Sequence, residues 1–232
     1  MIVILNHKSN LNKEEFINYI EELNKLNTKE KIIICPNYLN IPSLPDKYLI
    51  GSQNVSKTSN GSYTGEISAE QLKSYNVKYS LVGHSERRKN YNESLIDINS
   101  KIKELLNNDI IPILCIGETK EEKDNNKIKE VLKIQLETAL NNIEDKEKII
   151  IAYEPVWAIG TGLTPTIEEI ENTIAYIKEL VNNQKIVYGG SVNETNIDTL
   201  KNISNIDGYL LGGLSLKPIE LKKFLEKIDY IN

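Results

Sequence analysis

A carboxylate, Glu154, stands at the end of one apolar run of the sequence and directly before an unusual loop. The run 148–153 has the length and the β-branched residues of a buried strand. Pro155 cannot continue a strand ladder, because proline has no N–H to donate. The segment 156–162 is apolar at first and ends in Gly-Thr-Gly. This order predicts a catalytic base beneath a moving lid. For these residues alone, the alternative is a surface carboxylate before an ordinary loop.

A histidine and a lysine occupy similar positions. His84 directly follows the apolar run 78–83 and precedes a helix start, and Lys8 comes shortly after the run 2–5. A helix N-terminus disfavours a protonated ring, so we expect a neutral His84 that donates a hydrogen bond. With Glu154 as the base, His84 would polarise a carbonyl and Lys8 would offset negative charge. Taken singly, the histidine could equally be a core residue and the lysine a surface residue.

Glycines follow two further apolar runs, in Gly189-Gly190-Ser191 and in Gly212-Gly213. Backbone N–H groups can approach a phosphate closely there because no Cβ intervenes, although ordinary turns also use glycine. Together, the residues at these strand ends predict proton abstraction beside the carbonyl of a small phosphorylated substrate. The enediolate formed would lose phosphate in water, so a closing lid is a chemical need.

The elements that must position these groups alternate regularly. Eight short apolar runs recur along the chain, and most are followed by residues at helical spacing. Such alternation requires parallel strands with right-handed crossovers. Eight units in 232 residues predict an α/β fold, a (β/α)8 barrel that forms a single domain over residues 1–232. In such a barrel the active site lies at the C-terminal strand ends, where the candidate residues stand.

Several details of the helices are also predicted. Capping boxes are expected at Ser68 with Gln71, Thr119 with Glu122, and Thr166 with Glu169. The second of these should start one long helix over 120–139. Pro218 should open the last helix. Three prolines between 36 and 45 exclude a long helix there.

The composition narrows the class of protein. Hydrophobic residues make up 40% of the chain and the net charge is −5, so we expect neither a nucleic-acid surface nor a membrane span. The first residues carry no charged leader, which favours a cytoplasmic protein. Cys35 and Cys115 should be buried free thiols, as in a reducing compartment. Neither has a Cys or His at ligand spacing, and no metal site is expected.

As a set, these stretches resemble the triosephosphate isomerase family, and the resemblance runs from Asn6 to Lys217. The lid segment and His84-Ser-Glu-Arg-Arg88 are its most specific parts. The segments that carry it are 6–8, 53–54, 64–68, 83–88, 115–118, 152–162, 188–192 and 212–216.

The resemblance implies a cofactor-free enzyme of glycolysis and gluconeogenesis that interconverts D-glyceraldehyde 3-phosphate and dihydroxyacetone phosphate through an enediolate. It implies that Glu154 is the base, His84 the electrophile and Lys8 a catalytic cation. The substrate-binding residues it implies are Asn6, Lys8, Glu86, Gly160, Ser191, Gly212 and Gly213. The lid it implies consists of Pro155, Val156, Trp157, Ala158, Ile159, Gly160, Thr161 and Gly162.

A homodimer is a further implication. Thr64 would reach the partner's active site, with Glu66 and Arg87 supporting its loop. His7 and Ser9 stand where the family usually has Trp and Met, which pack near the first loop and the partner's third loop. The loss of that apolar area predicts a weaker dimer.

Pro165 departs from the family's usual hinge after the lid and would stiffen the motion of the lid.

Two other functions remain open at this point. An enzyme of the same fold could act on another sugar phosphate. A barrel that has lost activity could serve as a binding or scaffold protein, although the joint presence of Lys8, His84 and Glu154 argues against this.

Overall fold

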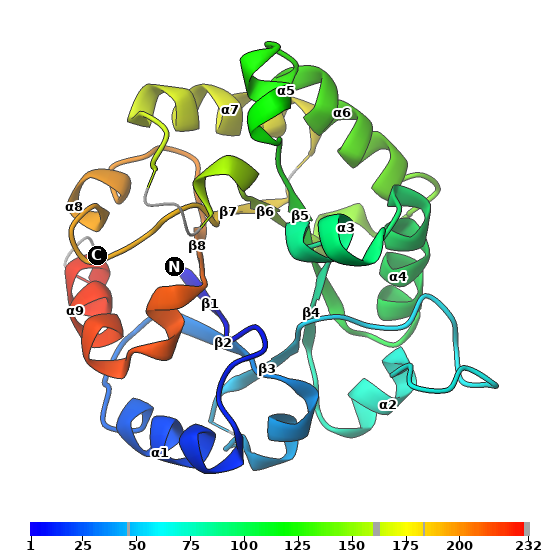
Figure 1. The fold of residues 1–232 in the computed structure, drawn as a ribbon, viewed down its shortest axis with the longest axis vertical. Helices are drawn as coiled ribbons and strands as arrows, with labels where there is room; N and C mark the ends of the chain where they lie inside the picture. The colour runs from blue at the N-terminus through cyan, green and yellow to red at the C-terminus, as the bar shows by residue number, and fades with distance from the viewer. Residues whose placement is uncertain (46, 160–162, 183, 230–232) are drawn as a thin grey trace.

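The computed structural model is a closed barrel of eight parallel strands in sequence order, with helices around the outside (Figure 1). The structure describes residues 1–45, 47–159, 163–182 and 184–229. The predicted (β/α)8 barrel is therefore confirmed. The strands are β1 (Ile2–Asn6), β2 (Lys31–Cys35), β3 (Leu49–Ser52), β4 (Tyr79–Val82), β5 (Ile111–Ile116), β6 (Ile150–Tyr153), β7 (Lys185–Tyr188) and β8 (Gly208–Leu211).

The barrel closes where the first strand meets the last. Ile2 of β1 pairs with Lys31 of β2 on one side and with Gly208 of β8 on the other. A Cβ on Gly208 would lie 1.8 Å from the carbonyl oxygen of Ile2. This closure therefore requires glycine at that position.

Amphipathic helices cover the strands. In α7, for example, Ile170, Ile174 and Ile177 are buried against the barrel while the acidic residues of its first turn face solvent. The α-helices are α1 (Lys13–Leu23), α2 (Ala69–Ser74), α3 (Ser85–Tyr91), α4 (Leu95–Asn107), α5 (Lys120–Asp124), α6 (Ile128–Ala139), α7 (Ile167–Leu180), α8 (Ile197–Leu200) and α9 (Pro218–Asp229). The short 3-10 helices are η1 (Tyr38–Ser43), η2 (Lys146–Lys148), η3 (Val156–Ala158) and η4 (Gly213–Leu216).

The predicted helix starts are confirmed. Capping boxes are present at Ser68, Thr119 and Thr166, and Pro218 is the first residue of α9. The proline-rich segment after β2 forms only the short helix η1.

The prediction of one long helix over 120–139 is wrong. The helix that starts after Thr119 ends at Asp124, and α6 begins at Ile128. Asn126 between them has φ 57°, a left-handed conformation that ends a helix and that asparagine tolerates. The charged run thus forms a separate short helix.

The core has two layers. One fills the inside of the barrel and includes Ile4, Ile33, Leu81 and Ile113. The other lies between the barrel and the helices and includes Phe16. In the part of the chain that the structure describes, no helix is both long enough and apolar enough to span a membrane.

Candidate active site

The side chains singled out in the sequence meet at the C-terminal end of the barrel. Glu154 directly follows β6, His84 comes two residues after β4, and Asn6 ends β1. They lie around one cavity of about 260 Å³. The predicted catalytic and substrate-binding residues that line this cavity are Asn6, Lys8, His84, Glu154, Ser191, Gly212 and Gly213. Ile159 of the predicted lid also lines it, whereas Glu86 is not among the lining residues.

The N-terminus of α3 orients His84. The residue is the N-cap of that helix, and its Nδ1 atom accepts a hydrogen bond of 3.3 Å from the backbone N–H of Glu86. A nitrogen that accepts such a bond carries no proton, so the proton of a neutral ring sits on Nε2. Nε2 lies 3.5 Å from Oε1 of Glu154, and both residues line the cavity.

The two groups influence each other's ionisation. Burial raises the pKa of Glu154, but His84, Cys115 and Lys8 lower it, and the net pKa lies below the usual value. Glu154 is therefore ionised at neutral pH, as a base must be. Burial is the largest single influence on the pKa of His84 and lowers it, but the charge of Glu154, the hydrogen bond to Glu154 and the charge of Glu86 together raise the pKa above its usual value. The neutral ring expected from the sequence is thus favoured by the Glu86 N–H and opposed by Glu154.

Lys8 is held in an uncommon backbone conformation, with φ 51°. Its backbone N–H donates to Oδ1 of Asn6 at 3.0 Å, and its carbonyl oxygen accepts from Nε2 of Gln53 at 2.8 Å. Its Nζ atom lies 2.6 Å from Oε1 of Glu86. Glu86 therefore contacts both His84 and Lys8. Gln53 supports the turn, a role that its presence in one of the family-like segments could have indicated.

Gly189 has a role that the sequence did not reveal. A Cβ on this residue would lie 2.6 Å from Cγ of Glu154. The buried carboxylate therefore occupies space that any larger residue at position 189 would take. This contact depends on the pairing of β6 with β7. Tyr153 lies opposite Tyr188, so the residues that follow them, Glu154 and Gly189, are also neighbours.

The first half of the predicted lid is anchored behind the cavity. The backbone N–H of Val156 donates to the carbonyl oxygen of Glu118 at 2.9 Å, and Nε1 of Trp157 donates to Oε1 of Glu118 at 2.7 Å. The hydroxyl of Ser191 donates to the carbonyl oxygen of Ala158. Glu118 is fully buried, and sequence analysis gave it no role. Gly160, Thr161 and Gly162 lie outside the described residues.

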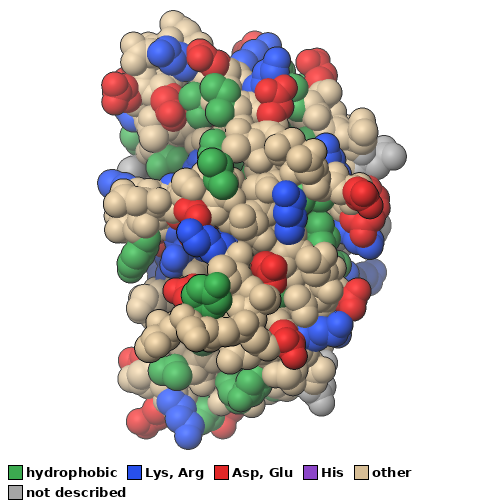
Figure 2. Space-filling model, turned by 90° about the vertical axis from the view of Figure 1, so that its right-hand side faces the viewer, with side chains coloured by type: hydrophobic (Ala, Val, Ile, Leu, Met, Phe, Trp, Pro, Cys, Tyr) green, Lys and Arg blue, Asp and Glu red, His purple; other side chains and the backbone are tan. Residues whose placement is uncertain are grey.

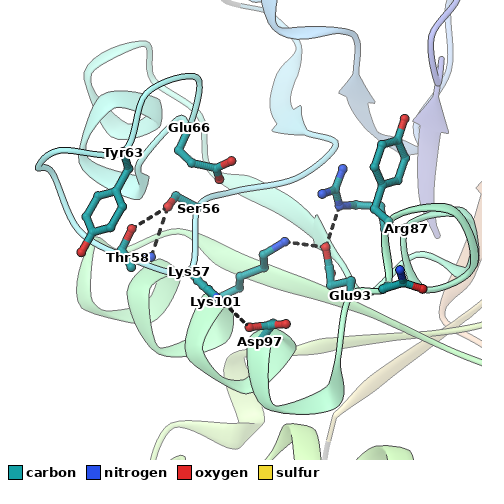
Figure 3. Close-up of a pocket in the computed structure, with 11 residues that line it drawn as sticks. Ser56, Lys57, Thr58, Tyr63, Glu66, Arg87, Glu93, Asp97 and Lys101 are labelled. Atoms are coloured by element: carbon teal, nitrogen blue, oxygen red, sulfur yellow. Dashed lines mark hydrogen bonds and ion pairs between the residues drawn. The ribbon is translucent and has the colours of Figure 1, made fainter.

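The predicted dimer residues lie on the side of the barrel from which the long β3–α2 loop extends (Figure 1). Thr64 and Glu66 are exposed on that loop. Glu66 and Arg87 both line a second cavity, of about 320 Å³ (Figure 3). Figure 3 shows Arg87 directed at Glu93, and its Nε atom donates to Oε2 of Glu93 at 2.6 Å.

Glu93 is the centre of a buried network beside this second cavity. Oε2 also accepts from Nζ of Lys101 at 2.5 Å, and Oε1 accepts from the backbone N–H of Gly83 at 3.2 Å. Lys101 reaches in turn to Oδ1 of Asn54 at 2.7 Å. The network joins the β3–α2 loop to the residue that precedes His84.

His7 and Ser9 differ in their surroundings. His7 is fully buried, with its ring 4.7 Å from that of Tyr19 and 6.0 Å from that of Phe16. Burial lowers the pKa of His7 to about 4. Ser9 is exposed. His7 therefore packs within its own subunit.

Fold and site together define a (β/α)8-barrel enzyme with a buried carboxylate and an imidazole over a glycine-lined cavity. A family model described as triosephosphate isomerase matches residues 1–229. The chain is 40% identical to the triosephosphate isomerase of Mycoplasma mobile, with 98% of each chain covered. It is 42% identical to that of Mesomycoplasma hyorhinis, over 89% of this chain and 86% of the relative. It is 36% identical to that of Clostridium botulinum, over 99% and 98%. The chain belongs to the triosephosphate isomerase family and is an isomerase.

Proposed function

We propose that the chain, acting as one catalytic domain, interconverts D-glyceraldehyde 3-phosphate and dihydroxyacetone phosphate, a step of glycolysis and gluconeogenesis. The observation that carries this proposal is the approach of His84 Nε2 to within 3.5 Å of Glu154 Oε1 in a cavity that Lys8 also lines. A base, a hydrogen-bond donor and a cation are thereby within reach of one small carbonyl compound.

The proposed reaction moves one proton between neighbouring carbons. The carboxylate of Glu154 removes a proton from the carbon beside the carbonyl, and the C–H electron pair becomes the C=C bond of an enediolate. The carbonyl oxygen takes up the negative charge, and the Nε2–H group of His84 and the ammonium of Lys8 stabilise it. The Nε2–H group of His84 then gives its proton to the former carbonyl oxygen and takes the proton of the neighbouring hydroxyl, whose oxygen becomes the new carbonyl oxygen, while Glu154 returns its proton to the other carbon. No cofactor is needed for this exchange.

The other end of the cavity would bind the phosphate. Ser191, Gly212 and Gly213 lie there on the loops after β7 and β8, where backbone N–H groups can face an anion. We assign Gly160 and Asn6 to substrate contacts from the family resemblance. A volume of about 260 Å³ is at the small end for ligand sites, in keeping with a small substrate such as a triose phosphate.

The lid of residues 155–162 would close over the bound substrate. Closure would exclude water and so protect the enediolate from loss of phosphate. Ile159 already lines the cavity, so a small movement of the lid changes the walls of the site directly. Pro165 would limit the backbone freedom of the second hinge.

A substrate panel tests this function. The purified chain is assayed with glyceraldehyde 3-phosphate and with pentose and hexose phosphates under identical conditions. We expect a kcat/KM for the triose phosphate at least 100-fold above that for any larger substrate. A preference for a larger phosphate would mean that the chain acts on another sugar. Absence of turnover with every substrate would leave a binding protein.

We also propose a homodimer built on the side that Figure 2 shows, the side of the β3–α2 loop. Apolar side chains are scattered there among both signs of charge (Figure 2). Tyr63 and Tyr91 line the second cavity and are 50% and 69% exposed, so both rings are open to contact with a partner. Thr64, beside Tyr63, would reach the partner's site.

The dimer and its strength can be measured together. Sedimentation and specific activity are followed as the protein is diluted from micromolar to nanomolar concentrations. Dissociation with a parallel loss of activity would support the proposed dimer, and its midpoint would show the effect of His7 and Ser9. A monomer with full activity at all concentrations would refute the proposed dimer.

We place the enzyme in the cytoplasm, since Cys35 and Cys115 are buried free thiols, as expected in a reducing compartment.

A further inference from the structure

Lys123 contacts both the lid and the helix that follows it. It lies on α5, and its Nζ atom is 3.7 Å from the ring centroid of Trp157, in the first half of the lid. The same atom is 3.0 Å from Oε1 of Glu169, in the first turn of α7. Because α7 follows the lid in the chain, one ammonium group joins the first half of the lid to the helix that comes after it.

The indole of Trp157 makes two polar contacts, one at its edge and one at its face. Its edge donates the hydrogen bond to the buried carboxylate of Glu118, and its face receives the cation. A lysine over the face of tryptophan is the most favourable cation–π pair for that cation. Such a contact at a partly exposed site changes an equilibrium constant by about twofold to fivefold.

Glu169 keeps Lys123 in place. Its own carboxylate is fixed by the backbone N–H of Thr166 at 2.8 Å, in the capping box of α7. That hydrogen bond and the one from Lys123 lower the pKa of Glu169, which remains charged at neutral pH. The fixed carboxylate of Glu169 therefore holds the ammonium group of Lys123 over the indole of Trp157.

This arrangement lies on the outer side of the lid. Figure 1 shows α5 beside α7 outside the ring of strands. Ile159 of the lid lines the substrate cavity, whereas Trp157 and Lys123 are not among the residues that line it. A lid that moves toward the cavity therefore carries Trp157 away from Lys123 and Glu118.

We propose that Lys123 is a positioning residue for the lid, which clasps Trp157 in the conformation seen here and so opposes closure over the substrate. This inference rests on the proposed function. It predicts that loss of the clasp shifts the lid toward closure, so that phosphate-bearing ligands bind more tightly and product leaves more slowly.

The experiment uses the fluorescence of Trp157, the only tryptophan in the 232-residue chain. The whole protein is titrated with 2-phosphoglycolate, and kcat and KM are measured on the same preparations. The variants are Lys123→Met, which keeps the aliphatic stem, and Lys123→Arg, which keeps the cation. Glu169→Gln retains a side chain suited to the capping box but removes its charge. Lys120→Met is the matched control, since Lys120 lies on the same helix and pairs with the exposed Asp124.

Lys123→Met should change the emission of the free protein and lower the half-saturating concentration of 2-phosphoglycolate about twofold to fivefold. KM and kcat should fall together, as expected when product release slows. Glu169→Gln should change the half-saturating concentration, KM and kcat in the same direction but by a smaller factor. Lys123→Arg should behave like the unmodified chain, because arginine keeps the cation. Lys120→Met should not differ from that chain.

Two results would overturn the clasp alone. One is an active chain in which Lys123→Met binds 2-phosphoglycolate as Lys120→Met does. The other is weaker binding by Lys123→Met. An unmodified chain with neither turnover nor a response to 2-phosphoglycolate would refute the proposed function, and the role of Lys123 with it.

Discussion

His84 and Glu154 face each other with Nε2 and Oε1 3.5 Å apart, although they come from different strand ends. The ring of His84 is fixed by the first turn of α3, and the backbone N–H of Glu154 donates to the carbonyl oxygen of Ile116 at 2.8 Å. Both groups are thus oriented by the scaffold before a substrate binds, which lowers the entropic cost of reaching a reactive geometry.

Replacement of His84 by Gln tests its part in charge stabilisation. Loss of one such donor costs about 10²–10³ in kcat in other enzymes, and we expect a decrease of that size here with little change in KM. Steady-state kinetics in both reaction directions measure it. A decrease below tenfold would assign His84 to structure alone.

Gly189→Ala tests how closely the base is packed. The added Cβ would lie 2.6 Å from Cγ of Glu154, so the carboxylate must move. A misplacement of about 1 Å can cost 100-fold in rate, and we expect kcat to fall by about that factor. Gly61→Ala is the control, since its new Cβ would meet only the ring of Tyr63, at 3.2 Å. Equal kinetics in the two variants would contradict the predicted displacement.

His7 should make the protein sensitive to acid. Its pKa is about 4 in the folded state, against 6.5 for an unperturbed histidine, so the unfolded chain binds the proton first as the pH falls. Its stabilising effect is complete above pH 6.5 and is lost as the pH falls toward 4. Between pH 7.5 and 5.0 this amounts to about 2 kcal/mol.

Urea denaturation of the unmodified chain and of His7→Phe at both pH values measures this effect, at one protein concentration. The unmodified chain should lose about 2 kcal/mol more stability than the variant on acidification. Identical losses would show that His7 titrates normally and is not buried as described.

Glu93→Gln should destabilise the fold strongly. Glu93 and Lys101 are both buried, with 3% and 7% of their side chains exposed, and the substitution leaves the lysine without a counter-charge. Breaking such a pair costs about 3–5 kcal/mol in the free energy of unfolding. Asp109→Asn, which breaks the exposed pair with Lys73, should have a much smaller effect, because solvent screens charges at the surface. Equal effects of the two substitutions would contradict a special role for the buried network.

Much of this architecture could be predicted from the sequence because its signals are local. The apolar runs and the capping boxes at Ser68, Thr119 and Thr166 depend on residues a few positions apart. The helix break at Asn126 also had a local signal, the pair Asn125 and Asn126, but the charged run around it gave the stronger impression of one long helix.

The remaining features depend on contacts between distant segments. The space that Gly189 leaves for Glu154, the bond between Glu93 and Lys101, and the clasp of Lys123 on Trp157 each require the closed barrel. The burial of His7 is another case, since only the packing of α1 decides whether a residue after β1 faces solvent.

The most direct test of the proposed mechanism is an isomerase assay with glyceraldehyde 3-phosphate on the unmodified chain, on Glu154→Gln and on Glu168→Gln. Glu168 is exposed on α7 and serves as the matched control. Glutamine keeps the shape of Glu154 but cannot accept the proton, so kcat should fall by about 10²–10⁴ while Glu168→Gln keeps full activity. Turnover by Glu154→Gln within tenfold of the unmodified chain would show that another group removes the proton.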